Sequence, residues 1–293
     1  MLDKDFKTID DQLKILRSRG LNIKNEEKCK TFLLHNNYYR ISGYSLTLRK
    51  NDVFFKNATF QNIIDIYEFD RELRNLLLGF IEIIEVKFKS IFAYELTKTY
   101  GSIGYLNSDL FTIQNKHSEI IAKAEAQKNT RLRHEAYLKH FVGDLKQPVP
   151  FWAYVDLLTI SDISFLYKIS DETIKKSVAI HLGLKMSKNE KILGQFMHSM
   201  TIIRNLCAHG SRLYNRLFEQ KPSLNSRELS LLRVMKDGTV DNAHLFGFIL
   251  IMKRLLSNED FVFLKNGILN IQKKYPFVSM NYYGFRDDWQ TTL

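Results

Sequence analysis

The sequence predicts an all-α protein, for three reasons. Only four prolines occur in 293 residues. Apolar residues recur at three- and four-residue spacing over most of the chain, which is the pattern of helices packed on a core. Strand-like residues are confined to one segment between residues 44 and 55. We therefore expect a helical bundle, with at most one small hairpin.

The N-terminal region, residues 1–58, is expected to be a helical extension of this bundle. A first helix over residues 9–19 ends at Gly20, a residue that favours a helix C-terminus. Asn25 is placed to cap a second helix that runs to Leu34.

The same region allows one hairpin. Residues 44–48 and 53–55 have strand character, and Asn51 and Asp52 between them favour a turn.

A long central helix is expected from about residue 60 to residue 99, with Thr59 as its N-cap. A wide apolar surface along it predicts the main element of the core; it consists of Ile63, Tyr67, Leu73, Leu77, Phe80, Ile84, Phe88 and Phe92. Glu82 and Glu85 on its polar face could do acid–base chemistry. We interpret them instead as part of a solvated or salt-bridged face.

Shorter helices follow the central one. Pro150 favours a helix entry at residues 151–158, and Ser170 with the following acidic residues favours another start. Beyond residue 221, helices are expected over 241–256 and 258–274. The aromatic tail up to Trp289 is expected to pack on the core, with base stacking as a less favoured alternative.

One further helix carries the motif that matters most for function. Ser187-Lys188-Asn189-Glu190 has the form of a capping box, so a helix begins near residue 188. Its buried stripe is expected to consist of Ile192, Phe196, Met200, Ile203 and Leu206. Gly210 is expected to end or kink this helix. If the helical period continued, one polar line would carry Asn205, His209, Arg212 and Arg216.

The end of this helix combines the groups that can break a phosphodiester without a metal. An RNA strand supplies its own nucleophile, the 2′-hydroxyl, so the protein must move protons and stabilise charge on the phosphate. We expect His209 to transfer protons. Arg204 can hold two phosphate oxygens, and Asn205 can orient His209 or the substrate.

A spacing of this kind also arises by chance. With 15 arginines and 8 histidines in the chain, roughly one accidental match of arginine, four to six residues and histidine is expected. A second match does occur, from Arg133 to His140 in the charged segment 128–146. We interpret that segment as a solvated helix or insertion.

Several sequence blocks together resemble a known family. Arg-Asn-Leu-Cys-Ala-His at 204–209 is followed by Ser-Arg-Leu-Tyr-Asn-Arg at 211–216. Other blocks are Asn-Tyr-Tyr-Arg-Ile-Ser-Gly-Tyr at 37–44, Tyr-Glu-Phe-Asp-Arg-Glu-Leu-Arg at 67–74, and the segments 150–159 and 284–289. In their order along the chain they resemble the Abi-D/AbiF-like abortive-infection proteins of the HEPN ribonuclease superfamily.

The resemblance implies a fold and a mode of action. It implies a HEPN-like helical core over residues 59–220, with a C-terminal helical region over 221–293 packed on it. It further implies a homodimer in which two motif helices supply both the acid and the base. An antiphage or toxin-like role, and association with a structured noncoding RNA, are also implied. Where the family commonly has a second histidine, this chain has Gly210.

Two groups of residues are candidates for RNA contact beyond the motif, because they combine aromatic and cationic side chains. The first group is Arg212, Tyr214 and Arg216, and the second is Tyr38, Tyr39, Arg40 and Tyr44. For the second group, a buried block of tyrosines is an equally good interpretation.

Composition sets the remaining expectations. A net charge of +11 favours a polyanionic partner such as nucleic acid. Cys29 and Cys207 are too few for a disulfide scaffold or a four-ligand zinc site, so we expect no metal and no cofactor. With no signal sequence or membrane span expected, the protein is predicted to be cytoplasmic.

Three functions of different classes therefore remain open. The first is a metal-independent RNA endonuclease, the second a noncatalytic RNA-binding protein on the same scaffold, and the third a helical protein-interaction subunit.

Overall fold

The computed structural model describes residues 6–293, and helices dominate it. The first half contains α1 (Ile9–Ser18), α2 (Glu26–Asn36), α3 (Tyr38–Tyr44), α4 (Phe60–Tyr100), α5 (Gln114–Arg131) and α6 (Ala136–Leu138). The second half contains α7 (Phe151–Tyr154), α8 (Ile160–Ile169), α9 (Glu172–His181), α10 (Asn189–Ala208), α11 (Ser226–Leu229), α12 (Phe246–Leu255), α13 (Asn258–Lys274) and α14 (Trp289–Thr292). The predicted all-α class is confirmed.

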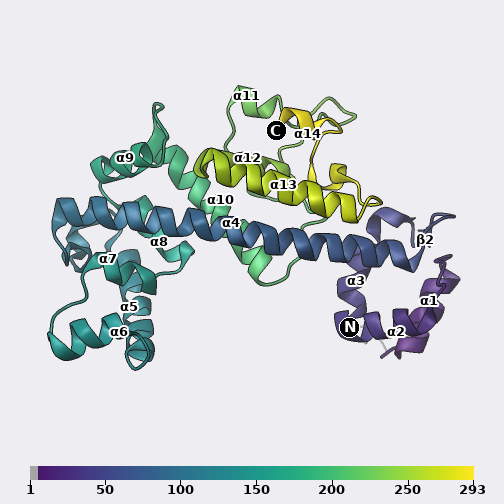
Figure 1. The fold of residues 1–293 in the computed structure, drawn as a ribbon, viewed down its shortest axis with the longest axis horizontal. Coiled ribbons are helices and arrows are strands. Elements are labelled where there is room, and N and C mark those ends of the chain that lie inside the picture. The colour runs from purple at the N-terminus through teal and green to yellow at the C-terminus, as the bar shows by residue number, and fades with distance from the viewer. Residues whose placement is uncertain (1–5) are drawn as a thin grey trace.

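Helix α4 is the axis of the molecule, and the other elements are arranged around it (Figure 1). Its 41 residues correspond to a length of about 60 Å. Thr59 and Asn62 form a capping box at its start, as the N-cap prediction requires, and Gly101 ends it at a φ of 80°. The predicted apolar surface is buried over most of its length, and α9, α10 and α13 pack against it.

The N-terminal extension has the two predicted helices, and Asn25 caps α2 through Lys28 N–H. The hairpin is present but shorter, with β1 (Arg49–Lys50) antiparallel to β2 (Val53–Phe54). The expected strand at 44–48 is wrong. Those residues belong to the end of α3 and a 3₁₀ turn, because buried Ile41 and Tyr44 recur at helical spacing.

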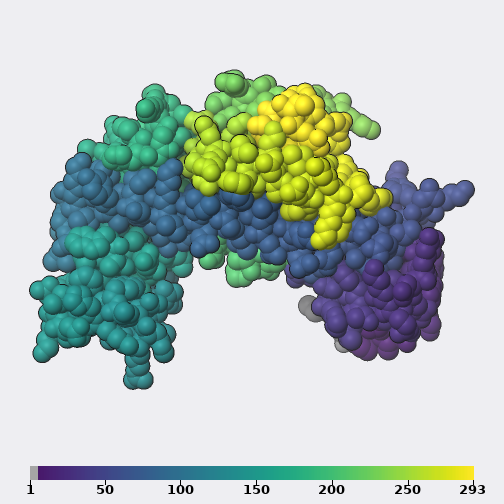
Figure 2. All heavy atoms as spheres, in the orientation of Figure 1, coloured from purple at the N-terminus to yellow at the C-terminus, as the bar shows by residue number. Residues whose placement is uncertain are grey.

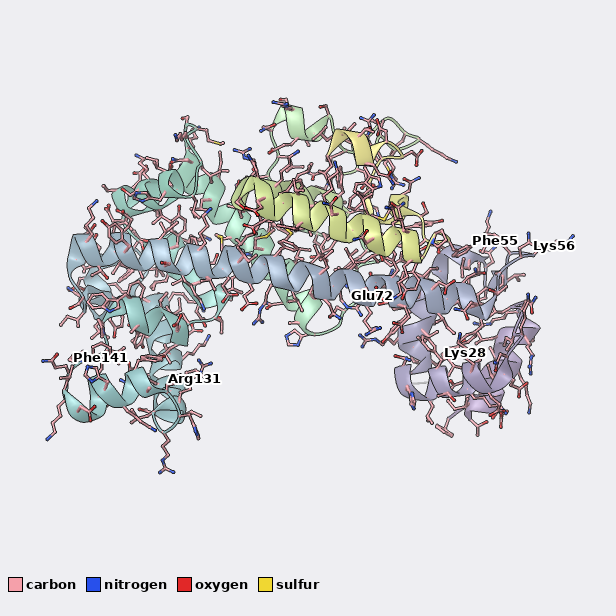
Figure 3. All side chains as sticks on the ribbon, viewed as in Figure 1. Lys28, Phe55, Lys56, Glu72, Arg131 and Phe141 are labelled. Carbon is pink, nitrogen blue, oxygen red and sulfur yellow. The ribbon has the colours of Figure 1, made fainter. Side chains whose placement is uncertain are left out.

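The C-terminal helices cover one side of α4. Glu72 on α4 binds both Lys274 (2.5 Å) and the hydroxyl of Tyr275 (2.7 Å) at the end of α13 (Figure 3). The helix predicted over 241–256 begins only at Phe246. The aromatic tail packs on the core as expected, with Tyr283, Phe285 and Trp289 all buried.

The molecule has the shape of an arch (Figure 2). One lobe, α1 to α3, lies below one end of α4, and a second lobe, built on α5 and α6, lies below the other end (Figure 1). Between them, the end of α10 and the loop after it emerge on the concave side of α4. Among residues 6–293, no helix combines the length and apolar character that a membrane span requires.

Candidate active site

The motif side chains occupy the last turn of α10, next to solvent. His209 is the C-cap residue, and its N–H donates to the carbonyl of Asn205 at 3.0 Å. Asn205 and His209 are exposed, and Arg204 is half-buried. The guanidinium of Arg204 lies 3.5 Å from Asn205 Oδ1, and no described carboxylate pairs with it. An arginine, an amide and an imidazole are therefore all accessible to a ligand.

Helix α10 is anchored through its opposite face, where Phe196, Met200 and Ile203 are buried. The capping box predicted at its start is wrong. Lys188 is the N-cap in a left-handed conformation (φ 57°), and no side chain caps the helix. Glu190 is buried, and its Oε2 makes no hydrogen bond to the helix start or to any other described residue.

The helix ends where expected, but the polar line predicted beyond it does not continue. Gly210 has a φ of 63°, which turns the chain out of the helix. Arg212 and Arg216 therefore lie in the loop that follows. Arg212 is half-buried, and its Nη1 donates to the carbonyls of Tyr214 and of Asn215 (3.2 Å). Arg216 lies over the ring of Phe218.

One buried carboxylate fixes this loop. Asp70 on α4 is 0% exposed, and it accepts the backbone N–H groups of Leu213 (3.1 Å) and Tyr214 (2.8 Å). It also accepts the hydroxyls of Tyr44 (2.8 Å) and Tyr283 (2.9 Å). Segments from the N-terminal lobe, the motif loop and the C-terminal tail thus meet at a single side chain.

Arg74 completes the cluster one helical turn along α4. Its Nη1 pairs with Asp70 and lies 3.5 Å from the carbonyl of Ser211. Burial raises the pKa of Asp70, while Arg74 and the hydrogen-bond donors oppose that shift. Because all five contacts on the carboxyl oxygens come from donors, the ionised carboxylate is the form that fits them.

Helix α3 reaches the motif directly. Arg40 is exposed, and its Nη2 donates to the carbonyl of Gly210, the residue after His209. A Cβ atom on Gly210 would lie 2.7 Å from this nitrogen. Glycine at this position therefore gives room for a guanidinium beside the histidine.

A comparison with family models decides which family this architecture represents. The model described as Abi-like protein matches residues 31–215. This range contains α3, α4, α10 and the loop that Asp70 fixes, and it covers more than half of the chain. The chain belongs to the Abi-like protein family. That membership associates it with abortive infection. Neither a curated protein nor a solved structure gives a significant match.

Two of the RNA-contact residues predicted for this Abi-like protein are wrong. Tyr44 is 0% exposed and Tyr214 is 2% exposed, so neither ring can stack on a base. Both are held in the core: Tyr44 by Asp70, and Tyr214 through a 2.7 Å hydrogen bond to Thr47. Tyr38 is half-buried against the core, whereas Tyr39 is 74% exposed. The tyrosine block is thus partly structural and partly surface.

The Abi-like chain keeps its motif cysteine in the core. Cys207 is buried against the Asp70 cluster, and burial raises its pKa to about 12. Its sulfur is therefore a neutral thiol at physiological pH, and it packs the helix as expected.

The other sequence candidates lie apart from this site. Glu85 pairs with Lys89 at 2.9 Å, in keeping with a salt-bridged face. Arg133 and His140 are exposed in the lobe of α5 and α6, where Figure 3 labels Arg131 and Phe141 at one end of α4. Within residues 6–293, no three His, Cys, Asp or Glu side chains lie together as the ligands of a metal ion would.

A cavity of about 830 Å³ lies between α8, α9 and α10, and Glu190 and His198 are among its lining residues. None of the three motif side chains lines it.

Sequence reasoning missed Asp70 and Arg74, which position the motif loop. The sequence nevertheless contains a pattern from which both could have been predicted. Both lie on the apolar face of the central helix, next to buried Phe69 and Leu73, where an unpaired charge would be costly. Charges at i and i+4 on a buried face indicate an internal ion pair with further partners.

Proposed function

We propose that this Abi-like protein is a metal-independent RNA endonuclease acting in abortive infection. His209 transfers the protons, Arg204 stabilises charge on the scissile phosphate, and Asn205 orients His209 or the substrate. The observation that carries this proposal is that exposed Asn205 and His209 lie beside half-buried Arg204 at the end of α10, and that no carboxylate within residues 6–293 pairs with Arg204.

The reaction needs an acid and a base, and one protomer offers one histidine at the motif. A two-fold dimer through the ends of α10 supplies two copies of His209 around one phosphate, because an isologous interface places each residue opposite its partner. Exposed Ala208 and half-buried Gly210 are small residues that permit such an approach. The site is therefore completed by the second subunit.

RNA is the partner that fits the surface. The chain carries a net charge of +11, and the motif lies on the concave side of the arch (Figure 2). A structured noncoding RNA that restrains or guides the enzyme is a further proposed partner. We place this reaction in the cytoplasm.

The test is cleavage of end-labelled RNA by purified protein in the presence of EDTA. We expect fragments ending in a 2′,3′-cyclic phosphate, and we expect His209→Ala to abolish them. His198→Ala is the matched control, since His198 is an exposed histidine on the same helix outside the motif. Equal cleavage by His209→Ala and wild type would end the proposal.

A noncatalytic RNA-binding protein is the second candidate, and Gly210 favours it, because the neighbouring position lacks a second imidazole. Salt-dependent RNA binding without any cleavage would support this candidate. A protein that binds no nucleic acid at low salt would instead be a helical interaction subunit.

A further inference from the structure

A hollow of about 500 Å³ opens at the corner between α2 and α3. It is lined by His35, Asn36, Asn37, Tyr39, Arg40 and Tyr67. Arg40 belongs to both the hollow and the motif, because its guanidinium binds the carbonyl of Gly210. The hollow therefore adjoins the end of α10, although Arg40 and Gly210 are 170 residues apart in the sequence.

The corner is built by Asn37, the residue between the two helices. It has a φ of 61°, and its side-chain oxygen accepts the N–H of Tyr39 at 2.8 Å. Its ψ of 134° places it outside the left-handed helical region, and its side chain caps the next helix. The position of Tyr39 and Arg40 is thus fixed by the backbone.

The side chains of Tyr39 and Arg40 can both make further contacts with a ligand. Tyr39 is 74% exposed, and its ring has no aromatic partner among the described residues. Arg40 uses one N–H group on Gly210, which leaves four donors of its fork. No carboxylate within residues 6–293 forms an ion pair with it. An aromatic face and a guanidinium with unused donors at one hollow are the elements of a nucleotide-binding site.

We propose that this hollow binds one unpaired nucleotide of the RNA strand, next to the phosphate that is cleaved. The base stacks on Tyr39, and Arg40 contacts a phosphate oxygen while it remains bound to Gly210. This inference rests on the proposed function and adds the substrate class. A base can stack on a side chain only when it is unstacked from its neighbours, so the strand must be single-stranded or looped at this position.

The glycine after the histidine supports the link between hollow and motif. Any side chain at position 210 would meet Arg40 Nη2 at 2.7 Å. With glycine there, the guanidinium of Arg40 binds the backbone of the residue that directly follows His209. One strand can therefore contact both Arg40 and His209.

The test measures RNA binding by protein that carries His209→Ala, so that no cleavage is needed. The probes are a short single-stranded RNA and the same sequence as a duplex. We expect the single strand to bind more tightly, and Tyr39→Ala to weaken its binding by about 5- to 100-fold, the usual range for loss of one stacked base. Tyr39→Phe should bind like the parent. Tyr94→Ala, which removes another exposed tyrosine, is the control.

A second variant tests the phosphate contact. Arg40→Gln should lower the slope of log affinity against log salt concentration by about one, with Arg40→Lys retaining it. Unchanged single-strand binding by Tyr39→Ala, or equal loss for duplex and single strand, would overturn the inference. These outcomes are independent of catalysis. A protein that binds through Tyr39 but never cuts would refute the nuclease and leave the subsite standing.

Discussion

At the scale of single residues, Asp70 shows how segments that are distant in the sequence are held together at one site. The sequence motif 204–209 could be read directly, because its chemistry lies in neighbouring residues of one helix. The partners of Asp70 come from positions 44, 74, 213, 214 and 283. No local sequence pattern predicts that these residues meet. For the same reason, the sequence left the burial of Tyr44 as one of two alternatives and did not indicate the burial of Tyr214.

Replacing Asp70 tests this role. Asp70→Asn removes the charge beside Arg74 and places amide N–H groups against donors, so we expect a loss of about 3 to 5 kcal/mol in the free energy of unfolding. RNA cleavage should fall as well, because the loop after His209 loses its anchor. Denaturant unfolding measures the stability. Asp65→Asn, on the same helix but only half-buried, is the control. A change below about 1 kcal/mol for Asp70→Asn would contradict the cluster.

At the scale of helices, most starts and ends were predictable because they depend on local signals. Thr59 and Asn25 cap the helices they were expected to cap, and Gly20 follows the end of α1 as expected. Helix α10 also begins next to the predicted residue 188, but it lacks the predicted capping box. Glu190 is buried there, and burial is a property of the whole fold that the local sequence does not reveal.

Two glycines give a matched test of the long central helix. Gly79 is exposed in the interior of α4 and a Cβ there would meet nothing within 4 Å. Gly79→Ala should therefore stabilise the protein by about 0.5 to 1 kcal/mol. Gly267 on α13 lies against Leu76 of α4, where a Cβ would be 2.8 Å from Leu76 Cδ1.

Gly267→Ala is therefore expected to destabilise, because it pushes α13 away from α4. Thermal or urea unfolding of both variants measures the difference. Equal effects of the two substitutions would show that α13 does not pack this closely on α4.

A buried histidine predicts a pH dependence of stability. His117 on α5 is 2% exposed, its Nε2 lies 2.7 Å from the carbonyl of Tyr105, and its Nδ1 has no partner. Burial lowers the pKa of His117 below its ordinary value of 6.5. The unfolded chain therefore binds a proton that the folded chain does not, over the interval just below pH 6.5.

The contribution of neutral His117 to the free energy of unfolding is therefore fully present above pH 6.5. It decreases as the pH falls through the interval below pH 6.5, by at most about 1.4 kcal/mol per pH unit. His117→Gln keeps a hydrogen-bond donor but cannot titrate, so its stability should be flatter with pH than that of wild type. Parallel curves for the two proteins would refute this assignment.

At the scale of the whole molecule, the fold class and the family followed from the sequence, but the arch did not. The lobes of α1 to α3 and of α5 to α6 flank the motif only because both pack below one long helix (Figure 1). The same arrangement leaves Asn205, Ala208 and His209 exposed at the end of α10, where we propose that a second subunit binds. A site shared between two protomers is the central claim of this account.

Mixing wild-type and His209→Ala protomers tests that claim most directly. After the subunits are mixed in equal amounts, unfolded and refolded together, only wild-type pairs hold two imidazoles, about one quarter of all dimers. We predict that RNA cleavage falls to about one quarter of that of the same total amount of wild-type protein. Cleavage that remains at about one half would mean that each protomer works with its own histidine alone, and the shared site would be contradicted.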